Sequence, residues 1–391
     1  MAIGIWRLGS IALVIGLAGC AERPIGNLVE VGVRDPDASI VDMLVATTRA
    51  PTNEPEGVMF SGERARGLRF ADIAVSIPPD SHRQVGEIQW PHSVPGDPSK
   101  DFVTASARVL DQPQARADFD KRLDKSATHD VLLFVHGYNT RFEEAVYRFA
   151  QIAHDSRADV VPVLFTWPSR GKALSYFYDR ESASYSRDAL EVVLQAMVDD
   201  KHVSEISVLA HSLGNMVAVE ALRQMSIRDH GLPPKIRNIM LASPDIDVDV
   251  FRREVAEIEG SGKAPPITLF VSQDDKALGL SKLIFGDEPR LGAVNPAEEP
   301  YRDILERARV HVVDLTQIAS DDIANHDKFA SSDVVRSIGA RLAAGQTLND
   351  GKISLGERVG AIVVNTADVA AKVTQFDPLE PREQVAPSET Q

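Results

Sequence analysis

The chain has 391 residues, which is enough for one large hydrophobic core or for two smaller domains. Hydrophobic residues make up 43% and charged residues 25%, which is an ordinary balance for a globular protein facing water. The formal net charge of -15 excludes nucleic acid as an expected partner, because phosphate recognition needs a basic surface.

The first residues have the pattern of a targeting segment rather than of a folded domain. One positive charge in Met1–Arg7 precedes the apolar run Leu8–Leu17, which is too short for a membrane span. The run ends in Leu17-Ala18-Gly19-Cys20, which resembles a bacterial lipobox. We therefore expect residues 1–19 to be a lipoprotein signal peptide.

That resemblance implies that Cys20 is lipidated and anchors the mature protein to a lipid bilayer. An ordinary secretory signal that happens to end in cysteine is the alternative. Cys20 is the only cysteine, so no intramolecular disulfide is possible. Ala21 follows it where an aspartate would favour retention at the inner membrane. By resemblance to Gram-negative lipoproteins, we expect the outer membrane, with the protein facing the periplasm.

The segment after the anchor divides into a tether and a strand-rich region. Residues 20–40 contain scattered Gly, Pro and Asp, which is typical of a flexible tether. The region from 41 to about 110 has short strand patterns broken by Pro, Gly and Asn, and it predicts an antiparallel extension or accessory layer. The strands expected in it are Asp42–Thr47, Asp72–Ile77, Glu87–Trp90 and Phe102–Leu110.

From Asp130 onward, short apolar runs alternate with longer amphipathic stretches, which predicts βαβ units and a mostly parallel sheet with helices on both faces. The expected strands are Val131–Val135, Val161–Phe165, Ile206–Ala210, Ile236–Leu241, Ile267–Val271 and Val310–Leu315. Pro162 is awkward inside a strand, so the second of these is expected to begin after it. The expected helices are Phe142–His154, Arg180–Asp199, Leu213–Met225, Val248–Ile258, Ala277–Phe285 and Phe329–Leu342.

The main domain is therefore expected over 41–345. A C-terminal helical segment is expected within 346–376, around Leu355–Val373. The polar, Pro- and Glu-rich stretch 377–391 predicts a disordered tail.

The run Val208 to Gly214 has the form of a nucleophile elbow. A short apolar strand ends in Ser212, which lies between the small residues Ala210 and Gly214, and a helical pattern follows. In such an elbow the serine sits on a sharp, strained turn that presents its hydroxyl above the sheet. A helix-capping serine is the alternative, but a cap does not require the whole strand, turn and helix pattern.

Other chemically competent residues follow successive strands, where an open α/β sheet binds ligands. His136 to Asn139 follow the first strand, Trp167 to Ser169 the second and Ser212 the third. Asp245 follows the fourth strand, and Asp274 and Asp275 follow the fifth. His326 lies in the loop after the last strand. This arrangement places a serine, alternative acids and a histidine on one edge, in the chain order Ser, Asp, His of α/β hydrolases.

These motifs together resemble a bacterial α/β-hydrolase family of the esterase/lipase superfamily, whose members are often secreted or lipid-anchored. The resemblance covers about residues 40 to 342, and it departs from many hydrolases in having Ala210 instead of glycine. It implies an α/β-hydrolase fold. The motifs that carry it are His136-Gly137-Tyr138-Asn139, Phe165-Thr166-Trp167-Pro168-Ser169, Ala210-His211-Ser212-Leu213-Gly214, Ser272 to Leu278 and Asn325-His326.

Acyl-transfer chemistry assigns roles to these residues. A serine hydroxyl needs a base, and His326 in a loop suits that role better than His311 inside a strand. The S-x-x-D-x-A-L form of Ser272 to Leu278 places the family's acid at Asp275, with Asp274 facing solvent or capping a helix and Asp245 as the outside candidate. The oxyanion should receive backbone N–H groups from Tyr138 and Leu213.

The sequence therefore predicts a serine carboxylic ester hydrolase of the esterase/lipase type that takes a small acyl ester. Serine, histidine and water suffice for this chemistry, so no cofactor is expected. No metal site is expected either, because the chain has no H-E-x-x-H motif and no clustered Cys/His spacing. The alternatives are a serine peptidase or amidase with the same triad, and a catalytically silent envelope binding protein with the same fold.

Overall fold

The computed structural model describes residues 25–33, 35–260, 264–308, 310–320, 322–343 and 363–364. The predicted signal peptide, Cys20, the first part of the tether, most of the C-terminal helical segment and the predicted tail lie outside the described residues.

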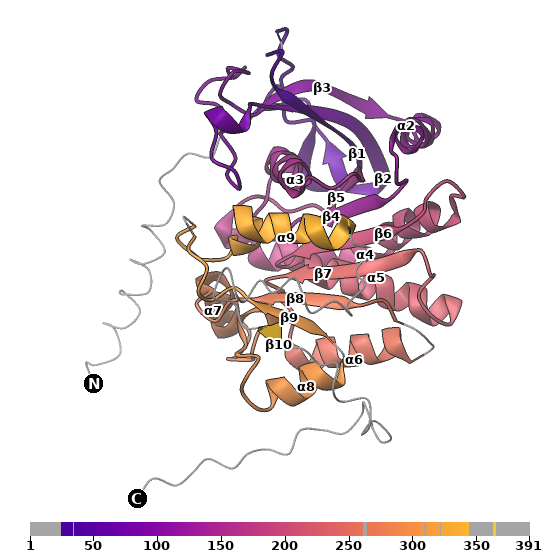
Figure 1. Ribbon diagram of the computed structural model, residues 1–391, viewed down its shortest axis with the longest axis vertical. Helices are drawn as coiled ribbons and strands as arrows, with labels where there is room; N and C mark the ends of the chain where they lie inside the picture. The colour runs from indigo at the N-terminus through magenta and orange to yellow at the C-terminus, as the bar shows by residue number, and fades with distance from the viewer. Residues whose placement is uncertain are drawn as a thin grey trace, which may run out of the picture.

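A ten-stranded sheet runs the length of the molecule in the order β10-β9-β8-β7-β6-β4-β5-β1-β2-β3 (Figure 1). The pairings of β1 with β5, β5 with β4, and onward through β6, β7, β8 and β9 are all parallel. The strands are β1 Ser39–Pro51, β2 Phe60–Ile77, β3 Val103–Leu110, β4 Val131–Val135, β5 Val161–Thr166, β6 Ile206–His211, β7 Ile236–Ala242, β8 Ile267–Val271, β9 His311–Asp314 and β10 Val363–Val364.

Helices cover both faces of this sheet. The α-helices are α2 Gln112–Lys125, α3 Phe142–Ser156, α4 Tyr176–Asp199, α5 Gly214–Asp229, α6 Val248–Glu259, α7 Lys276–Ile284, α8 Tyr301–Arg307 and α9 Ser332–Ala343. Short 3-10 helices occupy Asp80–His82, Ala173–Ser175, Leu291–Ala293 and Lys328–Ala330. The α/β-hydrolase prediction of a mostly parallel sheet between helices is confirmed.

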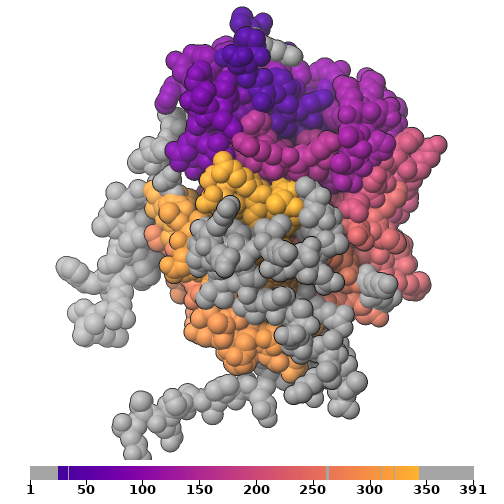
Figure 2. Space-filling model, viewed as in Figure 1, coloured from indigo at the N-terminus to yellow at the C-terminus, as the bar shows by residue number. Residues whose placement is uncertain are grey.

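Alternation along the strands divides the core into two layers. On β1, Leu44 and Ala46 pack with residues of α2, α4, α5 and α6, whereas Met43 and Val45 pack with α3 and α9. Successive side chains of a strand point to opposite faces, so each strand contributes to both layers. In Figure 2 the yellow residues of α9 lie next to purple and magenta residues of the N-terminal half, and α9 packs against α3.

The N-terminal strands are part of the main sheet. Residues of β1 pair in parallel with β5, and β2 and β3 continue the sheet by antiparallel pairing. The extension is therefore not a separate layer. The strand predicted at Glu87–Trp90 is wrong, because this stretch is irregular. A turn with Gly86 at φ 94° precedes it and Pro91 follows, and both residues disfavour a continuous ladder.

Pro162 lies inside β5, contrary to the expectation that the strand begins after it. Its backbone is paired with Leu132 of β4, but the pairing of β5 with β1 begins only at Val163. One side of β5 is therefore free of a ladder at Pro162, which is where a strand tolerates a residue without an N–H group.

Val363–Val364 corrects the prediction of helix around Leu355–Val373. These two residues form β10, which pairs antiparallel with Val312 and Val313 of β9. The β-branched side chains suit a strand, and β9 would otherwise present unpaired backbone groups at the edge of the sheet.

Two described helices, α2 and α8, were not expected from the sequence. The apolar side of α2 consists of Ala115, Phe119 and Leu123, while most of its other residues are charged or polar. Its start does carry a sequence signal, since Asp111 and Gln114 form a reciprocal capping box. Among the described residues, no helix is both long and apolar enough to cross a membrane.

Candidate active site

Ser212 occupies a strained turn between β6 and α5. Its φ angle is 52°, in the left-handed region that an L-residue rarely adopts. The turn is fixed by its own backbone, because the Ser212 N–H donates to Ala242 O at 2.9 Å and Asp245 N–H donates to Ser212 O at 3.3 Å. Strain of this kind persists only where the surroundings impose it, which is typical of a nucleophile elbow.

The loop after β4 packs directly against this elbow. A Cβ atom on Gly137 would lie 2.8 Å from Ser212 Cβ, and one on Gly214 would lie 2.3 Å from His136 O. Both positions therefore require glycine for the loop and the elbow to approach. Leu213 is the N-cap residue of α5, so its N–H lies at the positive end of the helix dipole. Leu213 lies in the elbow and Tyr138 lies in the loop after β4. Both predicted oxyanion donors therefore lie in the two chain segments that meet beside Ser212.

His326 is held by its backbone beside the elbow. Its carbonyl oxygen accepts a hydrogen bond from Ser243 Oγ at 3.2 Å, and its N–H donates to Asp322 Oδ2 at 2.6 Å. Ser243 directly follows Ala242, which is the backbone partner of Ser212. Ser243 was not singled out in the sequence, because a lone serine after a strand carries no signal of this role.

Asp275 is paired with His326. The ring Nδ1 of His326 lies 2.6 Å from Asp275 Oδ2, and the second carboxylate oxygen accepts the N–H of Leu278 at 3.0 Å. Asp275 is thus also the N-cap of α7, which is one of the two roles that the sequence left open for its neighbour Asp274. Among the described residues, no hydrogen bond joins the Ser212 hydroxyl to His326, and catalytic contacts of this kind are often loose before substrate binds.

The pKa of His326 is raised to about 9. Burial lowers this pKa, but the charge of Asp275 and the hydrogen bond to it outweigh burial, and the charges of Asp327 and Asp245 add to their effect. The ring is therefore mostly protonated at neutral pH in the resting state, and it becomes a base only when it loses that proton.

The other two candidate acids have different partners. Asp274 binds Lys328 Nζ at 2.7 and 2.9 Å, and this cation helps hold its pKa below the usual range although burial raises it. Asp245 accepts hydrogen bonds from Tyr176 Oη at 2.5 Å and Ser281 Oγ at 2.7 Å. In the described part of the chain, neither carboxylate is hydrogen-bonded to the ring of His326.

The two motif histidines are buried and uncharged. His136 stacks on Trp167 with ring centroids 4.9 Å apart, and its Nε2 accepts the Trp167 N–H at 3.1 Å. His211 stacks on Phe329, and its centroid lies 4.7 Å from that of His326. Burial lowers the pKa of His211 to about 3 and that of His136 well below its usual value. These contacts give both histidines a structural role, in the loop after β4 and beside the elbow.

A buried polar network supports the loop after β4, and it was missed by the sequence reasoning. Arg49 of β1 donates to Thr140 O and Ser169 O, both at 2.8 Å, and lies 3.3 Å from His136 Nε2. Ser169 in turn donates to Asp179 at 2.5 Å. Burial lowers the pKa of Arg49 to about 10. No local motif marks Arg49, because its partners lie about 90 and 120 residues further along the chain.

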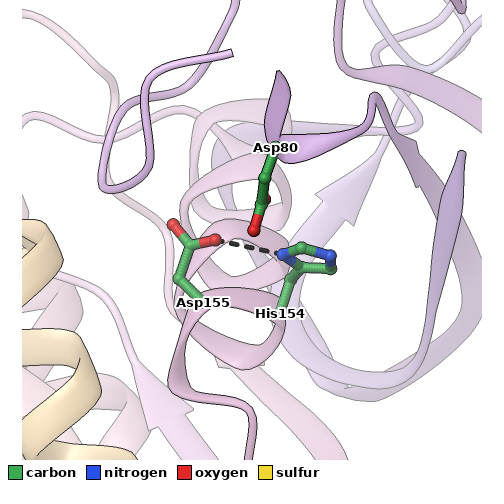
Figure 3. Close-up of side chains that lie close together, drawn as sticks. All are labelled: Asp80, His154 and Asp155. Atoms are coloured by element: carbon green, nitrogen blue, oxygen red, sulfur yellow. Dashed lines mark hydrogen bonds and ion pairs between the residues drawn. The ribbon is translucent and has the colours of Figure 1, made fainter. Parts of the chain in front are cut away.

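Among the described residues, two clusters of potential metal ligands lie elsewhere: Asp80, His154 and Asp155, and Asp120, Asp200 and His202. Figure 3 shows the first, with His154 Nδ1 3.0 Å from Asp155 Oδ1. Arg83 supplies a positive charge there, since it binds Asp80 at 2.8 Å and also contacts Asp155. This first cluster is therefore an internal ion-pair network.

Residues 111–344 match the family described as "Alpha/beta hydrolase of unknown function (DUF900)". The chain belongs to this α/β-hydrolase family. The match spans α2 to α9 and includes every residue predicted to take part in catalysis.

One related protein matches only part of this chain. An uncharacterized protein of Nostoc sp. is 27% identical over 154 residues, which is 33% of this chain and 39% of that protein. This chain therefore matches less than half of the length of that relative.

Two solved structures illustrate the low level of structural similarity. The Pyrobaculum calidifontis esterase is 13% identical with a TM-score of 0.31, over 70% of this chain and 81% of that one. The siderophore hydrolase EstB of Aspergillus nidulans is 12% identical with a TM-score of 0.35, over 82% and 96%. Scores this low do not add to the family assignment.

Proposed function

We propose that this protein is a serine hydrolase of carboxylic esters, anchored to the bacterial outer membrane through lipidated Cys20. The hydrolase class follows from the family, and the ester preference is part of the proposal. The observation that carries it is the Asp275–His326 pair, at 2.6 Å, held beside a strained serine between β6 and α5. This combination is the arrangement that acyl transfer requires.

The proposed reaction has two halves. His326 Nε2 accepts the proton of Ser212 as Oγ attacks the ester carbonyl, and the N–H groups of Leu213 and Tyr138 stabilise the oxyanion. The C–O bond to the alcohol then breaks, and the alcohol leaves with the proton from His326. Water, deprotonated by the same ring, attacks the acyl-enzyme and releases the carboxylic acid and Ser212. Asp275 orients the ring and stabilises its charged form throughout.

The decisive experiment is labelling of the mature protein with a fluorophosphonate, followed by a panel of esters with short to long acyl chains and the matching amides. Covalent labelling with preferential ester turnover is expected. Faster turnover of the amides would favour a peptidase or amidase. A wild-type protein that does not label would instead support a silent binding protein.

The pH dependence of the reaction follows from the raised pKa of His326. A general base must be neutral, so kcat/KM should increase with pH and reach half of its maximum near pH 9. The measurement is kcat/KM for a soluble ester from pH 6 to 10, corrected for spontaneous hydrolysis. Asp274→Asn is the matched control, because Asp274 pairs with Lys328 and not with His326, so it should keep the midpoint. A rate already constant above pH 7 would contradict this assignment.

The anchor has its own test. Cys20→Ser should leave an unprocessed chain without lipid, because the acylated side chain is removed. Acyl chains contribute about 0.8 kcal/mol per buried CH₂ to membrane binding, so several chains on one cysteine anchor stably. Detergent partitioning and intact mass measure the change, and Ser212→Ala should partition like the wild type. A wild-type protein that stays in the aqueous phase and carries no lipid mass would disprove the anchor.

A further inference from the structure

One cavity lies away from the candidate active site. Its volume is about 550 Å³, within the range typical of small-molecule sites. It lies on the α2 and α4 face of the sheet, and its floor is formed by Leu44, Ala46 and Val163 of β1 and β5. None of the residues proposed for catalysis lines it.

The cavity exists because two helices cover this face without closing it. Ala115 and Phe119 of α2 form one wall, and Val193 and Met197 of α4 form another. Figure 1 places α2 at the β3 end of the sheet, whereas α4 lies nearer the middle. Apolar side chains therefore line a hollow that is not filled by the protein itself. Such a surface favours an aliphatic group, since its burial removes apolar area from water.

The charged residues around the cavity are two acids and two arginines. Asp111 Oδ1 accepts the N–H of Gln114 at 2.8 Å, and Asp200 Oδ1 accepts the N–H of His202 at 2.9 Å. Both acids are thus engaged by local hydrogen bonds. Arg69 and Arg116, in contrast, are exposed, and in the described part of the chain neither guanidinium has a hydrogen-bond or ion-pair partner. Gln112 is the remaining polar residue of the lining.

The two unpaired guanidinium groups place positive charge beside the apolar lining, in a chain whose net charge is -15. A guanidinium binds a carboxylate in a bidentate manner, through charge-assisted hydrogen bonds. We propose that this cavity binds a free fatty acid, with the aliphatic chain between α2 and α4 and the carboxylate at Arg69 and Arg116. The site is separate from the ester-hydrolysing site and does not depend on the function proposed there.

Calorimetric titration of the full-length protein with octanoate, decanoate and dodecanoate, below their micelle concentrations, tests the proposal. Saturable binding of one equivalent is expected, with affinity increasing by up to about fourfold for each added CH₂. Ser212→Ala should bind equally well, because Ser212 does not line this cavity. Absence of saturable binding would overturn the proposal.

Two sets of variants locate the ligand. Arg69→Ala/Arg116→Ala should weaken dodecanoate binding about tenfold or more, while Arg66→Ala, an exposed arginine of β2 outside the lining, should not. Ala196→Trp adds bulk at an exposed lining position and should also weaken binding, whereas Asp188→Trp on the same helix should not. Binding unchanged in both the double arginine variant and Ala196→Trp would show that the fatty acid binds elsewhere, and would reject the site.

Discussion

Ser212→Ala should abolish fluorophosphonate labelling and reduce kcat for ester hydrolysis by about 10⁴–10⁶. The variant removes the oxygen that attacks the carbonyl, and the other residue between β6 and α5, Leu213, has no nucleophilic side chain. Alanine is compatible with the crowded turn, although it also has a Cβ atom at a positive φ. We therefore expect the melting temperature to change little.

The matched control is Ser226→Ala, which removes another buried serine from the α5 segment. Ser226 Oγ donates to carbonyl oxygens of α6 at 3.3 Å, so its loss affects packing but not the elbow. This variant should label like the wild type. Undiminished labelling of Ser212→Ala would exclude Ser212 as the nucleophile.

Asp275→Asn should reduce turnover by about 10⁴, because an amide no longer stabilises the imidazolium and disturbs the tautomer of His326. The substitution is well suited to the site. An asparagine side-chain oxygen can still accept the Leu278 N–H, so the start of α7 is preserved. Loss of the carboxylate charge should also lower the pKa of His326 from about 9. The midpoint of the residual pH profile should therefore decrease, which a merely structural change would not produce.

Asp274→Asn and Asp245→Asn are the comparisons for this experiment. Both carboxylates are bound to other side chains, Asp274 to Lys328 and Asp245 to Tyr176 and Ser281. We expect each to cost much less activity than Asp275→Asn, with all three proteins checked for folding by circular dichroism. The largest loss at Asp274 or Asp245 would reassign the acid but retain the serine hydrolase.

The central strands were predicted closely from the sequence. The predicted ranges Val131–Val135 and Ile267–Val271 coincide with β4 and β8. All ten of these residues are buried, since helices cover both faces, and a strand buried on both faces appears as a continuous apolar run. The helices that follow cover the sheet with one face only, and their predicted bounds differ from the observed ones by only a few residues.

The N-terminal third was harder to predict, for a physical reason. Whether β1 to β3 form a separate layer or extend the main sheet depends on the pairing of Leu44 with Val163, which are 119 residues apart. The local pattern of β1 is the same in either arrangement. The irregular stretch at Glu87–Trp90 shows the converse case, in which strand-forming residues have no ladder to join.

The sequence by itself determined the chemistry available to this protein: a serine between small residues after an apolar strand, with acids and a histidine after later strands. These signals are local, because turn sterics and strand burial act on neighbouring residues. The family resemblance favoured Asp275 over Asp274, but only the tertiary structure brings its carboxylate to His326 and places Arg49 under the loop beside Ser212. Adjacent side chains at the end of a strand point in different directions, so their partners are set by the segments that the fold brings against them.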